Sequence, residues 1–370
     1  MVAARTEDNG AVGTSYAVPV LVLHDAPLAP LTTFRLGGPA RRLVTATTDA
    51  EVVEAVRAAD RAGEPLLVLG GGSNLVIGDK GFDGTVLRIA TSGFTVDGTG
   101  VELAAGEVWS EAVARSVDLG LAGIEFLAGV PGSVGATPVQ NVGAYGQEVS
   151  ATIAEVVAYD RRTRQTVTIA GAACDFSYRH SRFKADPERH VVLRVRFSLE
   201  DAGGLSTPVK YAEVARTLGV GQGERVPLTT ARETVLALRA GKGMVLDPAD
   251  HDTWSAGSFF TNPILTQLQY ATFADRVRDH LGPDAQPPTY PAGDGRVKAS
   301  AAWLIDKAGF TKGWGTGPAR ISTKHTLALT NRGDATTEDL LALAREVRAG
   351  VRQVFGVELA NEPVLVGVRL

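Results

Sequence analysis

The sequence predicts an α+β protein with three consecutive regions, because strand-like and helix-like patterns are distributed unevenly along the chain. Strand and helix patterns alternate in the first region, antiparallel strand patterns dominate the second, and helical periodicity is concentrated in the last third. Single hydrophobic cores rarely grow beyond roughly 250 residues. A chain of 370 residues is therefore expected to form two or three domains.

The first region reads as a strand, a helix and a second strand. Residues 41–46 alternate as a strand does, Thr48 suits a helix N-cap, and residues 51–62 carry apolar side chains at helical spacing. Residues 65–69 form a short apolar run that predicts a buried strand. This run ends directly on a glycine-rich loop, which is a common position for a phosphate-binding loop.

The loop Gly70-Gly71-Gly72-Ser73-Asn74 matches neither of the two common nucleotide-binding motifs. The dinucleotide fingerprint needs a further glycine where the chain has Leu75, and strand patterns at 75–77 and 84–89 follow in place of a helix. A P-loop is excluded as well, since Asp79 stands where its lysine would be. The sequence therefore predicts a strand-to-strand loop whose main-chain N–H groups can bind a pyrophosphate.

A second glycine-rich segment covers residues 123–146. Its glycines remove Cβ atoms and permit positive φ angles, so that main-chain N–H groups can converge on an anion or lie against a flat ring. Gln140 and Asn141 add neutral amides that suit the edge of a heterocycle. Taken alone, the segment fits a plain cluster of turns equally well.

Periodicity predicts the remaining elements. Further strands are expected at 101–106, 154–159, 165–169, 191–199 and 364–368. Further helices are expected at 108–119, 231–240, 267–280, 300–308 and 339–355.

Composition excludes several classes of partner and site. The net charge of -4 gives no basic footprint for nucleic acid. Cys174 is the only cysteine, which excludes a disulfide framework and a thiolate zinc site, and the six histidines lack ligand-like spacing, so no metal is expected. The sequence shows neither a secretory signal nor an apolar run near the roughly 20 residues that cross a membrane. We expect a cytoplasmic monomer with a mobile tail at 1–20.

Five motifs together resemble the UDP-N-acetylenolpyruvoylglucosamine reductases, in their longer subtype. The motifs are the glycine loops at 70–74 and 129–146, YRHSRFK at 178–184, GSFFTNP at 257–263 and NEPV at 361–364, and the match runs from about Leu31 to Val368. The resemblance implies an FAD-binding fold of the vanillyl-alcohol-oxidase (PCMH) type in two subdomains, plus an α+β substrate-binding domain. The implied boundaries are 1–20 for the tail, 21–90 and 91–204 for the two subdomains, and 205–370 for the third domain. The last strand is free to return to the first subdomain.

The resemblance also implies the reaction and its catalytic residues. NADPH would reduce FAD, and hydride would then pass to C3 of the enolpyruvyl group of UDP-N-acetylglucosamine enolpyruvate, giving UDP-N-acetylmuramate for peptidoglycan synthesis. Ser258 matches the proton donor to C2, Arg179 the clamp on the substrate carboxylate, and Glu362 a carboxylate beside the substrate. Asn361 departs from the family, in which Pro is frequent at that position. Each residue alone also fits an ordinary role, as a turn serine, a loop arginine or a solvated glutamate.

Binding positions are implied by the same match. The FAD-binding positions are Gly70, Gly71, Gly72, Ser73, Asn74, Leu75, Pro131, Gly132, Ser133, Gly135, Ala136, Thr137, Gln140, Asn141, Gly143, Ala144 and Tyr145. The substrate-binding positions are Tyr178, Arg179, Tyr211, Lys242, Ser258, Asn262, Tyr290, Lys298 and Glu362. The two lysines suit a diphosphate as point charges, and the tyrosine of the 287–297 loop suits a lid. A solvated surface charge is the alternative for each lysine.

Two other functions stay open at this point. The first is an FAD-dependent oxidase of the same fold, although loop 70–74 lacks the His or Cys that often tethers flavin in such oxidases, so that any FAD is expected to be noncovalent. The second is a nucleotide-sugar-binding protein without catalysis, against which the joint presence of Arg179, Ser258 and Glu362 argues.

Overall fold

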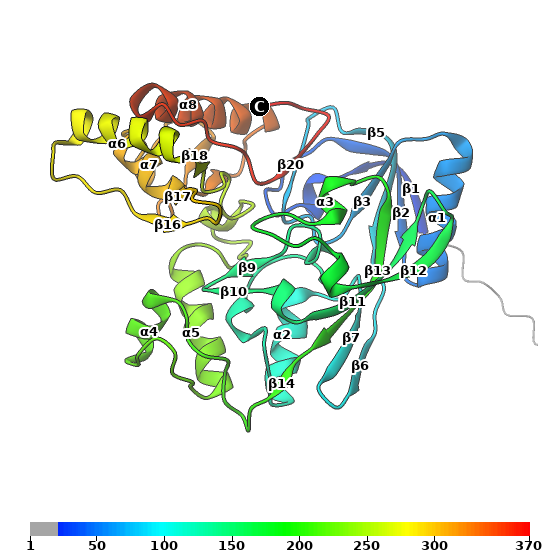
Figure 1. Cartoon of the computed structure of the whole chain (residues 1–370). Helices are drawn as coiled ribbons and strands as arrows, with labels where there is room; N and C mark the ends of the chain where they lie inside the picture. The colour runs from blue at the N-terminus through cyan, green and yellow to red at the C-terminus, as the bar shows by residue number, and fades with distance from the viewer. Residues whose placement is uncertain (1–20) are drawn as a thin grey trace, which may run out of the picture.

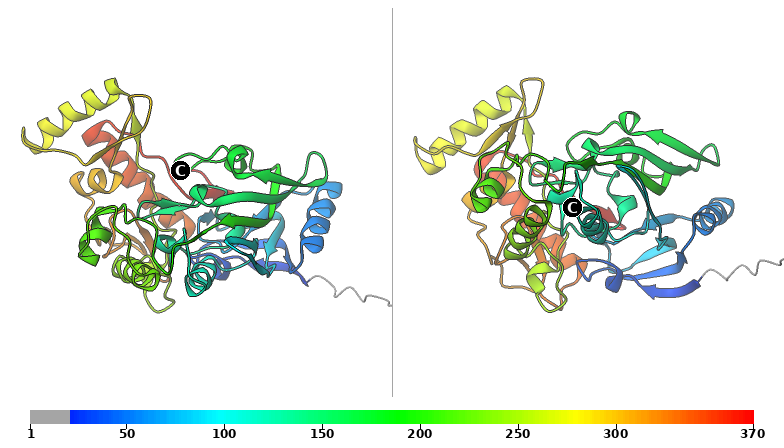
Figure 2. Two further views of the ribbon diagram at one scale, coloured as in Figure 1. Left: turned by 60° about the horizontal axis from the view of Figure 1, so that its bottom comes forward. Right: turned by 90° about the horizontal axis from the view of Figure 1, so that it is seen from below.

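The computed structural model describes residues 21–370 and confirms the predicted α+β class. The predicted mobile tail at 1–20 lies outside the described residues. Figures 1 and 2 show the N-terminal strands and α1 at one end of the molecule and helices α6, α7 and α8 at the other. The middle part of the sequence, coloured cyan to green, lies between these two ends.

The first sheet has four strands in the order β1-β2-β5-β3. Their bounds are β1 Leu21–Pro27, β2 Pro39–Ala46, β3 Leu66–Leu69 and β5 Phe82–Ile89. Helix α1 (Asp49–Ala62) connects β2 to β3, and both of these strands run parallel to β5. Thr48 caps this helix in a capping box with Glu51, as the polar pair before the apolar spacing predicts. Strand β1 was not predicted, because nearly all its side chains are exposed and carry no buried pattern.

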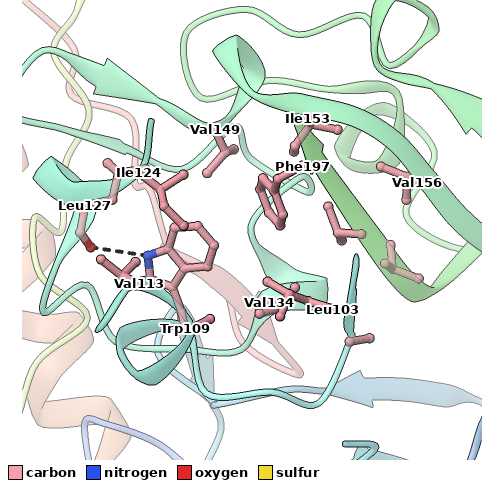
Figure 3. Close-up of a cluster of buried hydrophobic side chains, with 14 of the residues drawn as sticks. Leu103, Trp109, Val113, Ile124, Leu127, Val134, Val149, Ile153, Val156 and Phe197 are labelled. Carbon is pink, nitrogen blue, oxygen red and sulfur yellow. Dashed lines mark hydrogen bonds between the residues drawn. The ribbon is translucent and has the colours of Figure 1, made fainter. Parts of the chain in front are cut away.

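The second sheet is antiparallel, with five strands in the order β12-β11-β13-β7-β6. Their bounds are β6 Phe94–Asp97, β7 Gly100–Ala104, β11 Ile153–Asp160, β12 Gln165–Ala170 and β13 His190–Ser198. Helix α2 (Trp109–Asp118) packs its buried face beneath this sheet. Figure 3 shows the indole of Trp109 beside the ring of Phe197, with ring centres 5.7 Å apart, and the indole N–H donates to the Leu127 carbonyl at 3.2 Å.

One hydrophobic core joins the first two sheets. Val52 and Val56 of α1 and Leu87 of β5 belong to the same buried cluster as Trp109 and Phe197. Two later helices, α4 (Ala212–Leu218) and α5 (Leu228–Gly241), extend this cluster. The glycine-rich segment therefore lies in a region held rigid from several sides.

The last third of the chain forms a second core around helices α6 (Gln267–Leu281), α7 (Ala301–Lys307) and α8 (Thr337–Phe355). These three helices and α5 lie within a few residues of their predicted positions. Helix α4 was not predicted. No helix within residues 21–370 is long and apolar enough to cross a membrane.

Short elements complete the structure. They are β4 Leu75–Ile77, β8 Leu121–Ala122, β9 Gly143–Ala144, β10 Gln147–Glu148, α3 Arg182–Ala185, β14 Glu200–Asp201, β15 Ile264–Leu265, β16 Thr289–Pro291, β17 Val297–Ala299, β18 Ala319–Ile321, β19 Leu329–Asn331 and β20 Val364–Val366. The last of these, β20, pairs in parallel with β4, and Figure 1 shows the C-terminal segment running back to the N-terminal sheet region. This pairing brings the NEPV motif to the first glycine loop.

Candidate functional site

The two glycine-rich loops pack directly against each other. The Ser73 hydroxyl donates to the Pro131 carbonyl at 3.1 Å, which ties the first loop to the second. A Cβ atom at Gly71 would lie 2.7 Å from the Cα of Gly132, closer than real Cβ atoms approach. Glycine is therefore required where the two loops meet, and the loops form one continuous main-chain surface.

The first loop leaves a row of hydrogen-bond donors free. The main-chain N–H groups of residues 70–74 donate no main-chain hydrogen bond within residues 21–370. The loop carries no acidic side chain and directly follows a strand of the first sheet. Consecutive unpaired N–H groups in a glycine loop suit an anionic group such as a pyrophosphate. The expected FAD-binding loop thus has the donors that this role requires.

The second loop mixes buried and accessible positions. Ser133, Thr137 and Asn141 are buried, whereas Ala136 is exposed. The remaining predicted positions of this loop, like Leu75 after the first loop, are partly exposed: Pro131, Gly132, Gly135, Gln140, Gly143, Ala144 and Tyr145. The loop therefore presents main chain and small side chains on a surface that a large planar group can approach.

The two amides of this loop bond to protein groups. The Asn141 amide N–H₂ donates to Glu148 at 2.9 Å and to the Ser177 carbonyl at 3.2 Å. Gln140 accepts from the Asn74 amide at 2.8 Å and donates to Glu362 at 3.3 Å. In this structure Asn141 therefore fixes the fold of the loop, and Gln140 links the glycine loop to the catalytic candidate Glu362.

Arg179 and Glu362 form an ion pair although they lie far apart in the sequence. Arg179 Nε donates to Glu362 Oε1 at 3.0 Å, and Arg179 Nη2 donates to the Gly143 carbonyl at 2.9 Å. Their side chains are 20% and 13% exposed. Two of the three predicted catalytic residues thus meet at the edge of the second glycine loop.

Burial raises the pKa of the Glu362 carboxyl above its ordinary value, while Arg179, Lys184 and Gln140 act in the opposite direction. The main chain fixes the position of Glu362. Its N–H donates to the Phe259 carbonyl at 2.8 Å, and the neighbouring Asn361 forms an isolated antiparallel β-bridge with Phe260. A carboxyl group with a raised pKa holds its proton to a higher pH than an ordinary glutamate does.

Ser258 directly precedes Phe259, whose main-chain carbonyl accepts the hydrogen bond from Glu362 N–H. The rings of Phe259 and Phe260 are buried in the second core, and Gly257 has φ +73°. The Ser258 side chain is partly exposed. The GSFF and NEPV motifs therefore lie side by side, and Ser258 stands one residue from the main-chain contact between Phe259 and Glu362.

A second group of predicted residues surrounds Lys298. Its ammonium lies 4.5 Å from the ring centre of Tyr178 and 6.0 Å from that of Tyr290. Tyr290 pairs with Lys298 across β16 and β17 and is 52% exposed. Burial raises the pKa of the Tyr178 hydroxyl, which neighbours Asn262. The Asn262 side chain also caps the start of α7 by accepting from Ala301 N–H at 2.9 Å.

A third group lies at the other end of the second glycine loop. The rings of Tyr145 and Tyr211 meet edge to face with centres 5.5 Å apart, and the Lys242 ammonium lies 5.6 Å from the Tyr145 ring. Glu213 forms an ion pair with Lys242 at 2.6 Å. An anionic ligand can replace this carboxylate, because the lysine is a mobile point charge.

The structure adds two residues that the sequence reasoning did not single out. Lys184 lines a cavity of about 870 Å³ together with Tyr178, Arg179 and Asn262, and Glu213 holds Lys242. Lys184 stands inside the YRHSRFK motif, and Glu213 stands two positions after the predicted substrate-binding residue Tyr211. Among the described residues no cluster of His, Cys, Asp and Glu could hold a metal ion.

Family comparisons match both halves of the chain. Residues 40–162 match an FAD binding domain, and residues 247–366 match the C-terminal domain of UDP-N-acetylenolpyruvoylglucosamine reductase. A curated relative of that reductase name from Streptomyces avermitilis is 78% identical over 353 residues, covering 95% of this chain and 97% of the relative. A relative of the same name from Thermobifida fusca is 59% identical over 352 residues, covering 94% and 98%.

Solved structures show the same fold. The UDP-N-acetylenolpyruvylglucosamine reductase of Thermus caldophilus superposes with a TM-score of 0.63 at 25% identity, covering 94% of this chain and 99% of that one. The 6-hydroxy-D-nicotine oxidase of Arthrobacter nicotinovorans shares the fold alone, with a TM-score of 0.51 at 16% identity over 95% of this chain and 90% of that one. The predicted FAD-binding fold of the vanillyl-alcohol-oxidase type is confirmed.

Proposed function

Because the chain belongs to the family of the UDP-N-acetylenolpyruvoylglucosamine reductases, we propose that it uses NADPH to reduce UDP-N-acetylglucosamine enolpyruvate to UDP-N-acetylmuramate. Family membership makes the chain an FAD-containing oxidoreductase of peptidoglycan synthesis. The electron donor, the proton donor and the roles of individual residues belong to the proposal. The observation that supports these roles most strongly is the Arg179–Glu362 ion pair beside the second glycine loop.

The described residues fit FAD. Residues 70–74 would hold its pyrophosphate through their free N–H groups, and residues 131–145 would lie along the isoalloxazine and ribityl parts. When bound, FAD supplies hydride transfer, from NADPH to C3 of the enolpyruvyl group. No His or Cys lies in loop 70–74, which favours noncovalent binding.

Arg179 would bind the carboxylate of the enolpyruvyl group. Its guanidinium already donates to Glu362 and to the Gly143 carbonyl, and its planar fork has further N–H donors for a second carboxylate. Hydride addition at C3 places negative charge on C2 and on that carboxylate. A fixed guanidinium stabilises this charge as it develops, because the site needs no reorganisation at that moment.

Ser258 would donate the proton that completes the reaction at C2. A serine hydroxyl is a weak acid, so it requires a group that replaces its proton. Glu362 lies beside the same main-chain segment, and burial raises the pKa of its carboxyl, which favours a proton-holding role. Addition of one hydride and one proton balances the oxidation of NADPH to NADP⁺.

The remaining predicted residues would bind the nucleotide sugar. Lys242 and Lys298 supply positive charge at two places, and Tyr178 and Tyr290 supply ring faces next to Lys298. Lys242 would exchange Glu213 for a diphosphate oxygen. Tyr211 and Tyr290 are well exposed, which suits residues that close over a bound ligand. We further propose that the protein acts as a cytoplasmic monomer on small molecules, with neither nucleic acid nor membrane as a partner.

Anaerobic spectroscopy of the purified protein tests the proposal. NADPH is expected to bleach the visible flavin spectrum, and UDP-N-acetylglucosamine enolpyruvate is expected to restore it. Restoration by oxygen alone, with rapid turnover, would point to an oxidase of the same fold. Tight binding of the nucleotide sugar without restoration would point to a binding protein without catalysis.

A further inference from the structure

Lys184 occupies a position in the site that no assigned role explains. It lies in α3, directly after the turn that carries Arg179, and it lines the same cavity. Its ammonium donates to the main-chain carbonyl of Arg179 at 3.0 Å. A lysine that is half-buried and bonded to the backbone of a catalytic candidate differs from a solvated surface charge.

The turn that precedes α3 holds Arg179 in a backbone conformation that is rare for residues other than glycine. Ser177 and His180 close it with two main-chain hydrogen bonds of 3.1 Å each, and Arg179 at its tip has φ +53°. Residues other than glycine adopt this left-handed conformation rarely. The hydrogen bond that the Arg179 carbonyl accepts from Lys184 adds to these two and helps to hold the turn in this shape.

Helix α3 places Lys184 firmly enough to provide that contact. Ser181, which is fully buried, caps α3 by accepting from Lys184 N–H at 3.3 Å, and its hydroxyl donates to the Val139 carbonyl of the second glycine loop. Phe183 is buried in the main core. The lysine thus extends from a helix that is anchored on both sides, and the flexible stem needs to span only a short distance.

Charge gives Lys184 a second effect. The charged groups that face its ammonium are Arg179 on the adjoining turn and Glu362 on the C-terminal segment, while His180 and Glu358 line the same cavity. Burial lowers the pKa of Lys184, whereas the Glu362 carboxylate raises it. In return the lysine favours the ionised form of Glu362, against the burial that raises the pKa of that carboxyl.

We propose that Lys184 is a positioning residue for the reduction: it holds the Arg179 turn so that the guanidinium points at Glu362 and at the substrate carboxylate, and its charge balances Glu362. This inference rests on the proposed function. Lys184 need not touch the substrate, since its effect passes through Arg179 and Glu362.

Three variants test this role. Lys184→Met keeps an unbranched apolar side chain and removes both the charge and the donor, whereas Lys184→Arg keeps the charge and the donor. Arg182→Met is the matched control, because Arg182 is a basic side chain of the same helix that donates to the Ala173 carbonyl at 2.9 Å, away from the Arg179 turn. For each variant we would measure FAD content, the rate of flavin reduction by NADPH, and the rate of reoxidation by UDP-N-acetylglucosamine enolpyruvate between about pH 5 and pH 9.

Lys184→Met is expected to bind FAD normally and to slow reoxidation by about 10- to 100-fold, as a small misplacement of a catalytic group does. Its reoxidation profile should also shift to higher pH, because loss of the positive charge raises the pKa of Glu362 further. Lys184→Arg should recover most of the rate, and Arg182→Met should match the wild type.

Three results would overturn the inference in distinguishable ways. A wild-type enzyme that the substrate does not reoxidise would overturn the proposed function and this inference together. A wild-type enzyme that turns over, with Lys184→Met equal to it in rate and pH profile, would overturn only the role of Lys184. Loss of FAD content in Lys184→Met would make Lys184 a purely structural residue and would also contradict the proposal.

Discussion

The ion pair between Arg179 and Glu362 predicts strong energetic coupling, which a double-mutant cycle measures. Arg179→Met leaves a buried carboxylate without its partner, a change that costs about 3–5 kcal/mol for fully buried pairs. The side chains of Arg179 and Glu362 are 20% and 13% exposed, so we expect a loss of stability at the lower end of this range, about 3 kcal/mol. Glu362→Gln should cost about 1 kcal/mol, because the amide oxygen still accepts from the arginine.

The double variant Arg179→Met/Glu362→Gln should cost about 2 kcal/mol, since neither buried charge remains in it. The coupling energy is then about 2 kcal/mol, within the range measured for residues in contact. Urea unfolding followed by circular dichroism, with FAD held in the same excess throughout, gives these free energies. A common flavin concentration is essential because ligand binding itself stabilises the folded state.

The pH dependence of this coupling has a defined sign. Burial raises the pKa of Glu362 in the folded state, so the contribution of this carboxyl to stability is complete below its unfolded pKa and is lost as the pH rises through the folded value. At about pH 4, close to the ordinary pKa of a glutamate and below the raised folded value, Glu362 is protonated and no ion pair exists. The coupling should therefore be small at about pH 4 and larger at about pH 8. Coupling below about 0.5 kcal/mol at the higher pH, which is the additivity expected for independent sites, would refute the ion-pair argument.

Three further outcomes are expected. Ser258→Ala should keep FAD and its reduction by NADPH but lose about 10²- to 10⁴-fold in reoxidation by the enolpyruvyl substrate; unchanged turnover would remove Ser258 from the mechanism. Gly72→Ala should lose FAD, because a Cβ at this φ of +60° would overlap a neighbouring main-chain carbonyl. The visible absorbance per protein measures the FAD content. Gly63→Ala is the control and should keep FAD, because Gly63 has φ +62° with nothing within 4 Å of the added Cβ. Asp160→Asn should destabilise the protein at neutral pH, because the Arg189 hydrogen bond holds the pKa of Asp160 at about 2. This stabilisation is complete above the ordinary pKa of an aspartate and is lost as the pH falls through about 2. The free energies of unfolding of wild type and variant should therefore converge at about pH 2. An equal difference between them at neutral pH and at about pH 2 would contradict this prediction.

Local signals in the sequence sufficed for much of the fold. Helix α1 follows from the Thr48 cap and its apolar spacing, and α8 follows from a long amphipathic pattern with its own capping box at Thr336. Strand β1 escaped prediction because an exposed edge strand carries no alternation. Helix α4 is short and buries only Val214 and Ala215, so its apolar spacing is too sparse for periodicity to identify a helix.

The candidate site was predictable as a set of motifs and unpredictable as a set of contacts. The glycine loops and the three catalytic candidates stand out by residue type and order. The partners of these residues do not, because Gln140 and Glu362 are 222 positions apart in the sequence. Asn141 shows the same limit: an amide suits a heterocycle and a protein carboxylate equally well, and only packing reveals that Glu148 and Ser177 use it here.

The pairing of β20 with β4 has a consequence for how the enzyme matures in the cell. Asn74 and Glu362 are separated by 288 positions, yet they lie on adjacent strand ends. A chain made from its N-terminus exposes the first glycine loop and the open edge of β4 early, while the segment that carries Glu362 follows 288 positions after Asn74. Strand β4 has only three residues, so the strand edge that can pair wrongly before β20 is made is short. The first glycine loop can thus fold before Glu362, the proposed catalytic carboxylate, is in place.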